Sequence, residues 1–366
     1  MVKIGFMGLG LIAQLMHLPY LTATEGGGVP GAEVVAIYDV VPPLVEAIGK
    51  RYHIEGQYTD YNEFLERDDI EAVVILTPST EHARCCIDAL NAGKHVFVEK
   101  PLALNVKDVE RIIEAQKKNG RFLQVGYMKR HSNGFQIAME EFKKMENIKL
   151  IKCVSHSHGL FAHHKLLKKE IKFPVSKELI EKASAERQRQ IIEELGSETT
   201  PLEMSTYYWV NQSACHDTNV VRALFGDPKR VLRTEILPVE PRGSWVTSLW
   251  DYGDAVCVFE GSLTYLRYWD ESIWAYSPTK TVGLNFQRWN VKNAPPTIEV
   301  FEGTEREVST KIVGRYDSDF QEELVHFIES IKTGKKPTTD AEDAKGDTVL
   351  ASAMIKNYRS KQPIEI

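Results

Sequence analysis

The chain of 366 residues lacks several features that mark specialised protein classes. No stretch approaches the roughly 20 uninterrupted apolar residues of a membrane-spanning helix. The sequence has 45 basic and 51 acidic residues, and a net charge of −6 offers no general attraction to nucleic acid or anionic membranes. Internal repeats and low-complexity tracts are also absent. We therefore predict a globular protein with no nucleic-acid partner and no membrane partner.

Cysteine is scarce, and its pattern does not suit a disulfide framework. The five cysteines are odd in number, two are adjacent, and no CxxC motif occurs; they are Cys85, Cys86, Cys153, Cys215 and Cys257. The N-terminus runs directly into a glycine turn without the pattern of a signal peptide. We expect reduced thiols and a cytoplasmic location. A nucleophilic Cys215 beside His216 is the less favoured alternative, because free cysteines are mostly small core residues.

What is present is an ordinary globular composition, with 43% hydrophobic and 26% charged residues. The length suggests about two domains. Residues 1–127 alternate short apolar strands with helices, which predicts a doubly wound parallel sheet. We predict strands at 3–7, 33–39, 72–76, 95–99 and 122–126, and helices at 11–23, 42–52, 81–92 and 106–119.

The pattern changes after about residue 127, and we predict a second α/β domain over residues 128–366. An extended run covers residues 148–158, and strand-like runs fill residues 229–310, which favours an open, mainly antiparallel sheet. Residues 165–200 are rich in charge and resemble a helical insertion that Ser176 caps and Gly196 ends. Two further helices are predicted at 320–331 and 341–358.

The first chemical motif is the GxGxxA turn of Gly8, Gly10, Leu11, Ile12 and Ala13, which follows a strand and opens a helix. Such a turn lets backbone approach a pyrophosphate, and the helix N-terminus supplies N–H groups. Asp39 ends the second strand, where a carboxylate accepts a hydrogen bond from the ribose 2′-hydroxyl. Because that carboxylate would repel a 2′-phosphate, we predict NAD as the cofactor in preference to NADP. A plain connecting turn and a simple strand-end cap are the alternatives.

The second motif is Glu99-Lys100-Pro101, at the carboxyl end of a predicted strand, where open α/β sheets bind ligands. A lysine there can stabilise a developing alkoxide, although a surface ion pair explains it equally well. Upstream, Thr77-Pro78-Ser79 closes another strand, and His82 follows on a helix.

Together these segments resemble the Gfo/Idh/MocA family of NAD(P)-dependent oxidoreductases, most clearly in GKHVFVEKPLA over residues 93–103. The resemblance implies a Rossmann domain and a second domain whose open sheet often forms an oligomer interface, hence a homodimer, tetramer or higher homo-oligomer. It implies that Lys100 lies beside the nicotinamide and the reacting carbon. It also implies that the cofactor is lined by Thr77, Pro78, Ser79, His82 and Glu99. Ser79 stands where many relatives have Asn.

The third motif, residues 212–226, aligns with D-x-G-x-H-x-x-D-x-x-R-x-L-x-G of sugar-oxidising relatives. His216 keeps the histidine position, whereas Gln212 and Asn219 replace the two carboxylates. The resemblance makes His216 the catalytic base, and by residue type alone a core histidine is equally expected. Asn219 should share a helix face with His216, whereas Asp217 should face away. Arg222 is interpreted as structural.

Further substrate contacts are predicted from the second domain. Arg130 lies on a segment that resembles the family's crossing between domains, and His156 and His158 share one face of a predicted strand. These histidines could chelate zinc, but no matching ligands lie nearby in sequence, and we predict no metal. All six tryptophans follow residue 200, and we expect most of them to serve subunit packing rather than sugar stacking.

The motifs lead us to expect NAD-dependent oxidation of a secondary hydroxyl in a sugar, glycoside or polyol, with the glucose 3-position as one candidate. Reduction of an enone, an imine or a dihydrodiol-type substrate is the first alternative. A non-catalytic NAD(H)-binding sensor is the second, because both carboxylates of the third motif have become amides.

Overall fold

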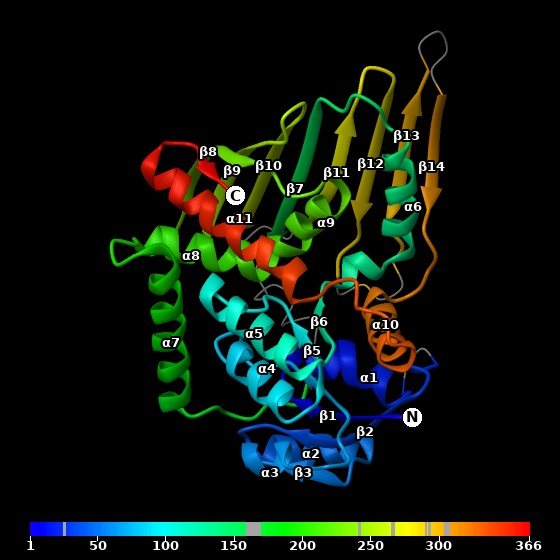
Figure 1. The fold of residues 1–366 in the computed structure, drawn as a ribbon, viewed down its shortest axis with the longest axis vertical. Helices are drawn as coiled ribbons and strands as arrows, with labels where there is room; N and C mark the ends of the chain where they lie inside the picture. The colour runs from blue at the N-terminus through cyan, green and yellow to red at the C-terminus, as the bar shows by residue number, and fades with distance from the viewer. Residues whose placement is uncertain are drawn as a thin grey trace. The chain divides into compact units, whose positions relative to one another are not determined.

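A computed structural model describes residues 1–24, 27–158, 170–240, 243–264, 268–289, 291, 294–303 and 308–366, without the side chains of residues 157 and 158 (Figure 1). The chain divides into two compact units. The first unit contains Met1–Tyr127, Leu167–Glu194 and Phe320–Lys345, and the second contains Met128–Leu166, Leu195–Asp319 and Gly346–Ile366. The sequence suggested a single boundary after residue 127, whereas in the structure the chain returns twice to the first unit.

The first unit is built on a six-stranded parallel sheet with the order β3-β2-β1-β4-β5-β6. This confirms the doubly wound sheet. The order reverses between β1 and β4, and ligands bind at the carboxyl ends of strands beside such a reversal. The strands are β1 (Val2–Met7), β2 (Ala32–Tyr38), β3 (Gly56–Tyr58), β4 (Ala72–Ile75), β5 (His95–Glu99) and β6 (Leu123–Gly126).

One helix of the first unit, α5 (Val106–Asn119), begins and ends at capping residues. Asn105 accepts a hydrogen bond from the amide of Asp108 at the start of α5, and Gly120 ends that helix with a φ of +60°. The helix expected over residues 11–23 is helical over residues 11–21 and contains a π-helical turn before its last four residues. The elements are η1 (Ala13–His17), α1 (Leu18–Leu21), α2 (Pro42–Tyr52), α3 (Tyr61–Leu65), α4 (His82–Asn91), α5 (Val106–Asn119) and α10 (Asp319–Thr333).

Two later segments join the first unit because their apolar residues are buried there. On α10, the ring of Phe327 lies 5.8 Å from that of Phe97, and the ring of Phe320 lies 5.6 Å from that of His17. On α7 (Lys177–Leu195), Ile191 is fully buried. The Ser176 hydroxyl accepts a hydrogen bond from the amide of Leu179, which confirms the predicted start of α7.

The second unit contains a nine-stranded sheet with the order β14-β13-β12-β11-β7-β10-β9-β8-β15. Every neighbouring pair is antiparallel except β7 and β10, so the mainly antiparallel sheet is confirmed. The strands are β7 (Leu150–His158), β8 (Arg230–Val239), β9 (Gly243–Asp251), β10 (Val256–Thr264), β11 (Asp270–Tyr276), β12 (Lys280–Phe286), β13 (Thr297–Glu302), β14 (Val308–Val313) and β15 (Ile364–Glu365).

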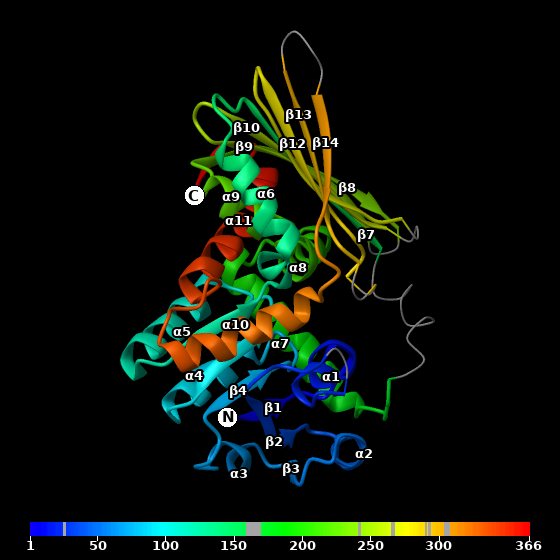
Figure 2. The same ribbon diagram turned by 90° about the vertical axis from the view of Figure 1, so that its right-hand side faces the viewer.

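Helices cover one face of this sheet, as Figure 2 shows for α6, α9 and α11. Along β9, Val246, Ser248 and Trp250 are buried on one face, whereas Trp245 is 44% exposed. The core of this unit contains a stack of Trp250 on Phe259. The helical elements are η2 (Met128–His131), α6 (Asn133–Lys143), α8 (Pro201–Trp209), η4 (Val210–Ala214), α9 (Cys215–Phe225) and α11 (Ala341–Ser360).

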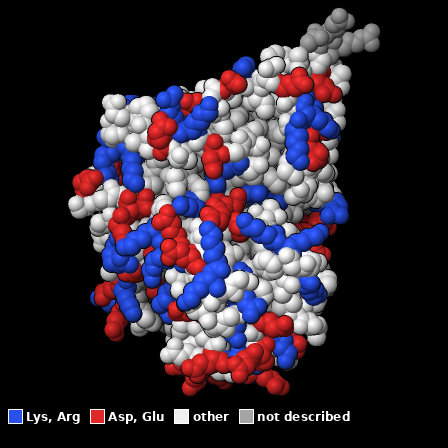
Figure 3. Space-filling model, viewed as in Figure 1, with Lys and Arg blue, Asp and Glu red and all other residues white. Residues whose placement is uncertain are grey.

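The surface agrees with the near-balanced composition. Acidic and basic side chains are interspersed on the face drawn in Figure 3. Among the described residues, no helix has the length and apolarity needed to cross a membrane.

Replacing Phe259 by alanine tests the core of the second unit. Phe259 is fully buried, and its ring lies 5.4 Å from that of Trp250. We expect Phe259→Ala to lower the free energy of unfolding by about 3–5 kcal/mol, because the change leaves a cavity under the sheet. Urea unfolding measures the change. Val308→Ala, at a 51% exposed position, should stay within about 0.5 kcal/mol of the wild type. Equal stabilities of the two variants would contradict this packing.

Candidate active site

The glycine turn after β1 is shaped by two different requirements. Gly8 has a φ of +87°, and a Cβ atom there would lie 2.5 Å from the carbonyl oxygen of Leu76, so only glycine fits. At Gly10 a Cβ atom would meet no atom within 4 Å. Gly10 therefore leaves open space beside exposed backbone, which a pyrophosphate group needs. Leu11 and Ile12 are partly exposed and continue the turn into η1.

Asp39 directly follows β2 and is attached to the same turn. Its Oδ2 accepts a hydrogen bond of 2.8 Å from the amide of Leu9, and its Oδ1 accepts one of 3.0 Å from the amide of Val41. Burial raises the pKa of Asp39, against the effect of these backbone hydrogen bonds. The carboxylate thus lies at the glycine turn, the position that suits recognition of a ribose hydroxyl.

His82 at the start of α4 joins two further predicted cofactor loops. Its Nδ1 lies 2.7 Å from the carbonyl oxygen of Pro101, and its Nε2 lies 2.9 Å from that of Thr77. Burial lowers the pKa of His82, against the effect of its contacts with the two backbone carbonyls. In the loop after Thr77, Pro78 is exposed and Ser79 is 8% exposed. His82 therefore holds these loops together through their backbone.

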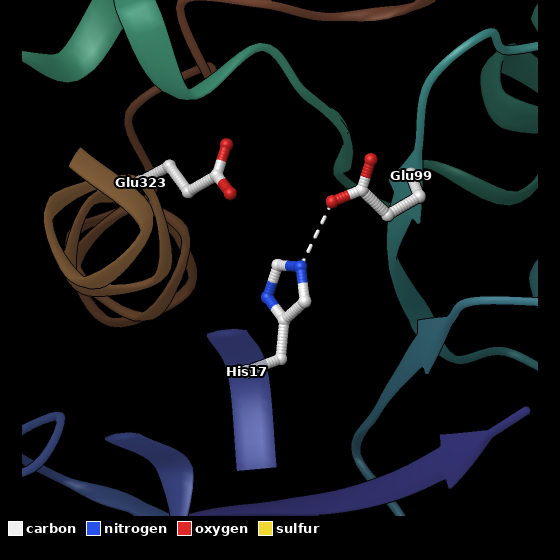
Figure 4. A group of neighbouring side chains, drawn as sticks. All are labelled: His17, Glu99 and Glu323. Carbon is white, nitrogen blue, oxygen red and sulfur yellow. Dashed lines mark hydrogen bonds and ion pairs between the residues drawn. The ribbon is translucent and has the colours of Figure 1, made fainter. Parts of the chain in front are cut away.

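Glu99 and Lys100 lie at the carboxyl end of β5. The Glu99 Oε1 accepts a hydrogen bond of 2.8 Å from the Nε2 of His17, which is fully buried on η1 (Figure 4). Its Oε2 accepts one of 3.1 Å from the backbone amide of Lys100. Hydrogen bonding to His17 lowers the pKa of Glu99, although burial opposes it. Glu99 thus orients the backbone that carries the partly exposed Lys100 side chain.

Glu323 on α10 completes a buried group with His17 and Glu99, and their potential ligand atoms lie within 4.8 Å of one another (Figure 4). These residues could hold a divalent cation. The 2.8 Å between His17 Nε2 and Glu99 Oε1 is nevertheless a hydrogen-bond distance, shorter than the ligand spacing of about 3.3 Å around tetrahedral zinc. We therefore interpret the group as a support for Glu99. The sequence motifs did not reveal His17 or Glu323, because both are distant from Glu99 along the chain.

In the second unit, His216 lies in the first turn of α9 and Gln212 on the preceding π-helical turn, η4. Both side chains are partly exposed. This exposure suits residues that contact a small molecule.

Asn219, also on α9, is fully buried within a polar network. Its Oδ1 accepts a hydrogen bond of 2.8 Å from Arg130, and its Nδ2 donates one of 2.7 Å to Asp347. Arg222 forms ion pairs with Asp347 and Asp227, in line with its interpretation as a structural residue. The structure thus brings Arg130 and Asn219 together, and Asn219 connects Arg130 to α11.

Asp217 forms a buried ion pair with Lys129 that the sequence did not predict. It is fully buried, where it accepts hydrogen bonds from Lys129 at 2.5 Å and from Ser155 at 2.6 Å. Lys129 also donates to Glu271 at 2.5 Å. The two carboxylates raise the pKa of Lys129 against the effect of burial, and burial raises that of Glu271. The adjacency of Asp217 to His216 was the one signal in the sequence, because its partners lie 62 to 88 residues away along the chain.

The predicted histidines of β7 fall partly outside the described residues. His156 Nδ1 lies 2.8 Å from the hydroxyl of Ser262, and its ring lies 5.3 Å from that of Trp245. Burial lowers the pKa of His156. The backbone of His158 belongs to β7, but its side chain lies outside the described residues. Their substrate contacts and the absence of a metal both stay predictions.

The fold and the glycine turn define a dinucleotide-binding Rossmann protein. Residues 2–127 match the family model described as "Oxidoreductase family, NAD-binding Rossmann fold". This match covers the first domain of the chain and supports the resemblance to the Gfo/Idh/MocA family found in the sequence. The expectation of NAD as the cofactor agrees with that description.

Sequence relatives support the same assignment. The inositol 2-dehydrogenase of Salmonella typhimurium is 41% identical over 136 residues, which cover 37% of this chain and 39% of that enzyme. The chain therefore matches well under half the length of this relative. The myo-inositol 2-dehydrogenase of Thermotoga maritima is 24% identical over 100% of this chain and 98% of its own length.

Solved structures agree in fold over both units. A levoglucosan dehydrogenase in complex with NADH and levoglucosan gives a TM-score of 0.77 at 16% identity, covering 100% of this chain and 99% of that chain. An aldose-aldose oxidoreductase from Caulobacter crescentus, complexed with glycerol, gives 0.73 at 18% identity, with the same coverage. At these identities the likeness shows the fold alone.

The Lys129 network generates a stability prediction. Lys129→Met should lower the free energy of unfolding by about 3–5 kcal/mol, because it leaves Asp217 and Glu271 buried without their cation. Lys152→Met is the matched control. Lys152 pairs with Glu260 at the surface, and its loss should cost less than about 1 kcal/mol. Urea unfolding at neutral pH measures both changes, and a Lys129 variant as stable as the control would argue against the buried pairing.

Proposed function

We propose that this protein oxidises a secondary hydroxyl of a sugar, glycoside or polyol by hydride transfer to NAD. The observation that carries the proposal is the position of Lys100, a partly exposed cation at the carboxyl end of β5 in the unit that bears the glycine turn. The Salmonella and Thermotoga relatives, both named as inositol dehydrogenases, support a polyol-type substrate. The proposal also includes glycosides as substrates and the glucose 3-position as a site of oxidation.

Bound NAD supplies the hydride acceptor of this reaction. His216 takes the hydroxyl proton as hydride leaves the carbon, and the Lys100 ammonium donates a hydrogen bond to the oxygen as it becomes a carbonyl. Glu99 supports Lys100 through the hydrogen bond to its backbone amide. Gln212 orients His216 or a neighbouring hydroxyl.

Four further residues of the second unit bind and orient the remaining substrate hydroxyls in this proposal. The hydrogen bond to Asn219 orients Arg130, and the contact with Ser262 orients His156. The full set is Arg130, Asn219, His156 and His158. A homo-oligomer built on the open sheet is part of the same proposal.

Two substitutions test the catalytic roles. Lys100→Met and His216→Ala should each lower kcat on an accepted sugar or polyol by about 10²- to 10⁴-fold, because each removes a group that acts on the substrate oxygen. Absorbance at 340 nm measures turnover, and NADH fluorescence measures binding, which should change less than about threefold. Lys118→Met, at an exposed position on α5, is the control and should keep full activity.

Three outcomes would overturn parts of this proposal. Near wild-type turnover in the His216 variant would remove it as the base. Reduction of enones or imines, together with inertness toward every sugar and polyol in a broad panel, would favour the reductase alternative. Bound nucleotide that no such compound oxidises or reduces would favour a sensor.

Asp39 generates a prediction on cofactor preference. Asp39→Ser removes the carboxylate that a 2′-phosphate would meet, while a serine hydroxyl can still accept a hydrogen bond from the amide of Leu9. The ratio of NADP to NAD affinities should rise by at least about tenfold, which corresponds to about 1.4 kcal/mol. Titration of both reduced nucleotides by fluorescence gives the ratio. An unchanged ratio would mean that Asp39 does not face the ribose.

A further inference from the structure

Residues 170–194, which we call the strap, form contacts with three loops of the first unit. These loops follow β1, β4 and β5, and the carboxyl ends of these three strands meet at one edge of the parallel sheet. This is the edge where doubly wound sheets bind nucleotides. The strap therefore lies against the loops that the proposed function assigns to NAD.

The first contact joins the start of the strap to the glycine turn. The Gln14 amide receives a hydrogen bond of 2.9 Å from the Ile171 backbone N–H and donates one of 3.1 Å to the Ile171 carbonyl. Its Nε2 also donates to the carbonyl of Leu9 at 2.7 Å. Gln14 is only 2% exposed, so one buried amide connects the strap to the turn between Gly8 and Gly10.

The second contact joins the end of the strap to the loop after β4. Gln190 on α7 is 4% exposed, and its Nε2 donates a hydrogen bond of 2.9 Å to the carbonyl oxygen of Thr80. The adjacent Ile191 is fully buried. Thr80 directly follows Ser79 of the predicted cofactor loop. This anchor therefore combines a buried amide with a buried apolar side chain.

The third contact lies at the N-terminus of α5, in the chain that follows Lys100. Glu194 accepts a hydrogen bond of 2.9 Å from the backbone amide of Val106, and Glu193 pairs with Lys107 at 2.7 Å. A carboxylate at a helix N-terminus is stabilised by the free amides there. Between the anchors, residues 172–182 are exposed. The strap is thus fastened at its two ends.

We propose that the strap retains the nucleotide: its anchors hold the loops after β1 and β4 in their binding conformation and so slow the release of NAD(H). Gln14 and Gln190 are the positioning residues of this device. The inference rests on the proposed function, in that NAD must bind at the glycine turn. The proposal predicts that the wild type holds NAD(H) tightly and releases it more slowly than variants whose anchors are broken.

The first test breaks the anchor at the glycine turn without changing the turn itself. Ile171→Pro removes the backbone N–H that Gln14 accepts from, whereas Ile171→Ala keeps it and serves as the matched control. Stopped-flow displacement of NADH from the full chain gives the dissociation rate. We expect Ile171→Pro to raise that rate on the order of tenfold, since about 1.4 kcal/mol corresponds to a factor of ten. Ile171→Ala should stay within about twofold of the wild type.

The second test breaks the anchor at the loop after β4. Gln190→Ala should raise the NADH dissociation rate by about five- to tenfold, whereas Lys182→Ala, on the exposed face of the same helix, should not. The melting temperature and kcat at saturating NAD are recorded alongside, because a merely structural role would lower stability without changing the release rate of the folded protein.

The outcomes of these tests distinguish a failure of the strap proposal from a failure of the proposed function. If the wild type binds NADH and both anchor variants release it at the wild-type rate, the strap does not retain the cofactor and the proposed function stands. If the wild type binds no NADH, both proposals are overturned. Faster release in Ile171→Pro and Gln190→Ala, at unchanged rates in the two controls, supports the retaining role.

Discussion

The first unit depends on one geometric constraint: parallel strands all end at the same edge of their sheet. Four loops that are distant in sequence therefore converge, those after β1, β2, β4 and β5. Short hydrogen bonds then connect the loops, from Leu9 to Asp39 and from His82 to the carbonyls of Thr77 and Pro101. The chemistry proposed for this edge is a consequence of its topology, because no single loop contains more than a part of the site.

Local sequence patterns predicted most of this architecture, because they depend on neighbouring residues. The bounds of α2 and α5 agree with the predicted helices, and Ser176 caps α7 as predicted. What the patterns missed depends on distant partners. The three residues of β3 are too few to show a periodicity. The face of α9 that carries Asp217 could be predicted to turn from His216, but its burial against Lys129 and Glu271 required the folded chain.

The amide at residue 219, where the family resemblance in the sequence leads one to expect a carboxylate, has a physical explanation in its surroundings. Asn219 accepts from Arg130 with its oxygen and donates to Asp347 with its nitrogen. A carboxylate at this position could not donate and would place two buried negative charges side by side. In this chain, therefore, the carboxylate of the local network is supplied by Asp347 on α11 instead of by residue 219.

The single parallel pair in the second sheet, β7 with β10, has a consequence for how this unit is assembled. On one side of that pair β8, β9 and β10 follow one another as hairpins, and on the other β11 to β14 do the same. Each run can form from contacts close in sequence. β7 lies between the two runs, against β10, which begins about 100 residues further along the chain. Because this pairing closes a long loop, we expect the addition of β7 to be the slow step in forming the sheet. Hairpin formation alone cannot complete the sheet.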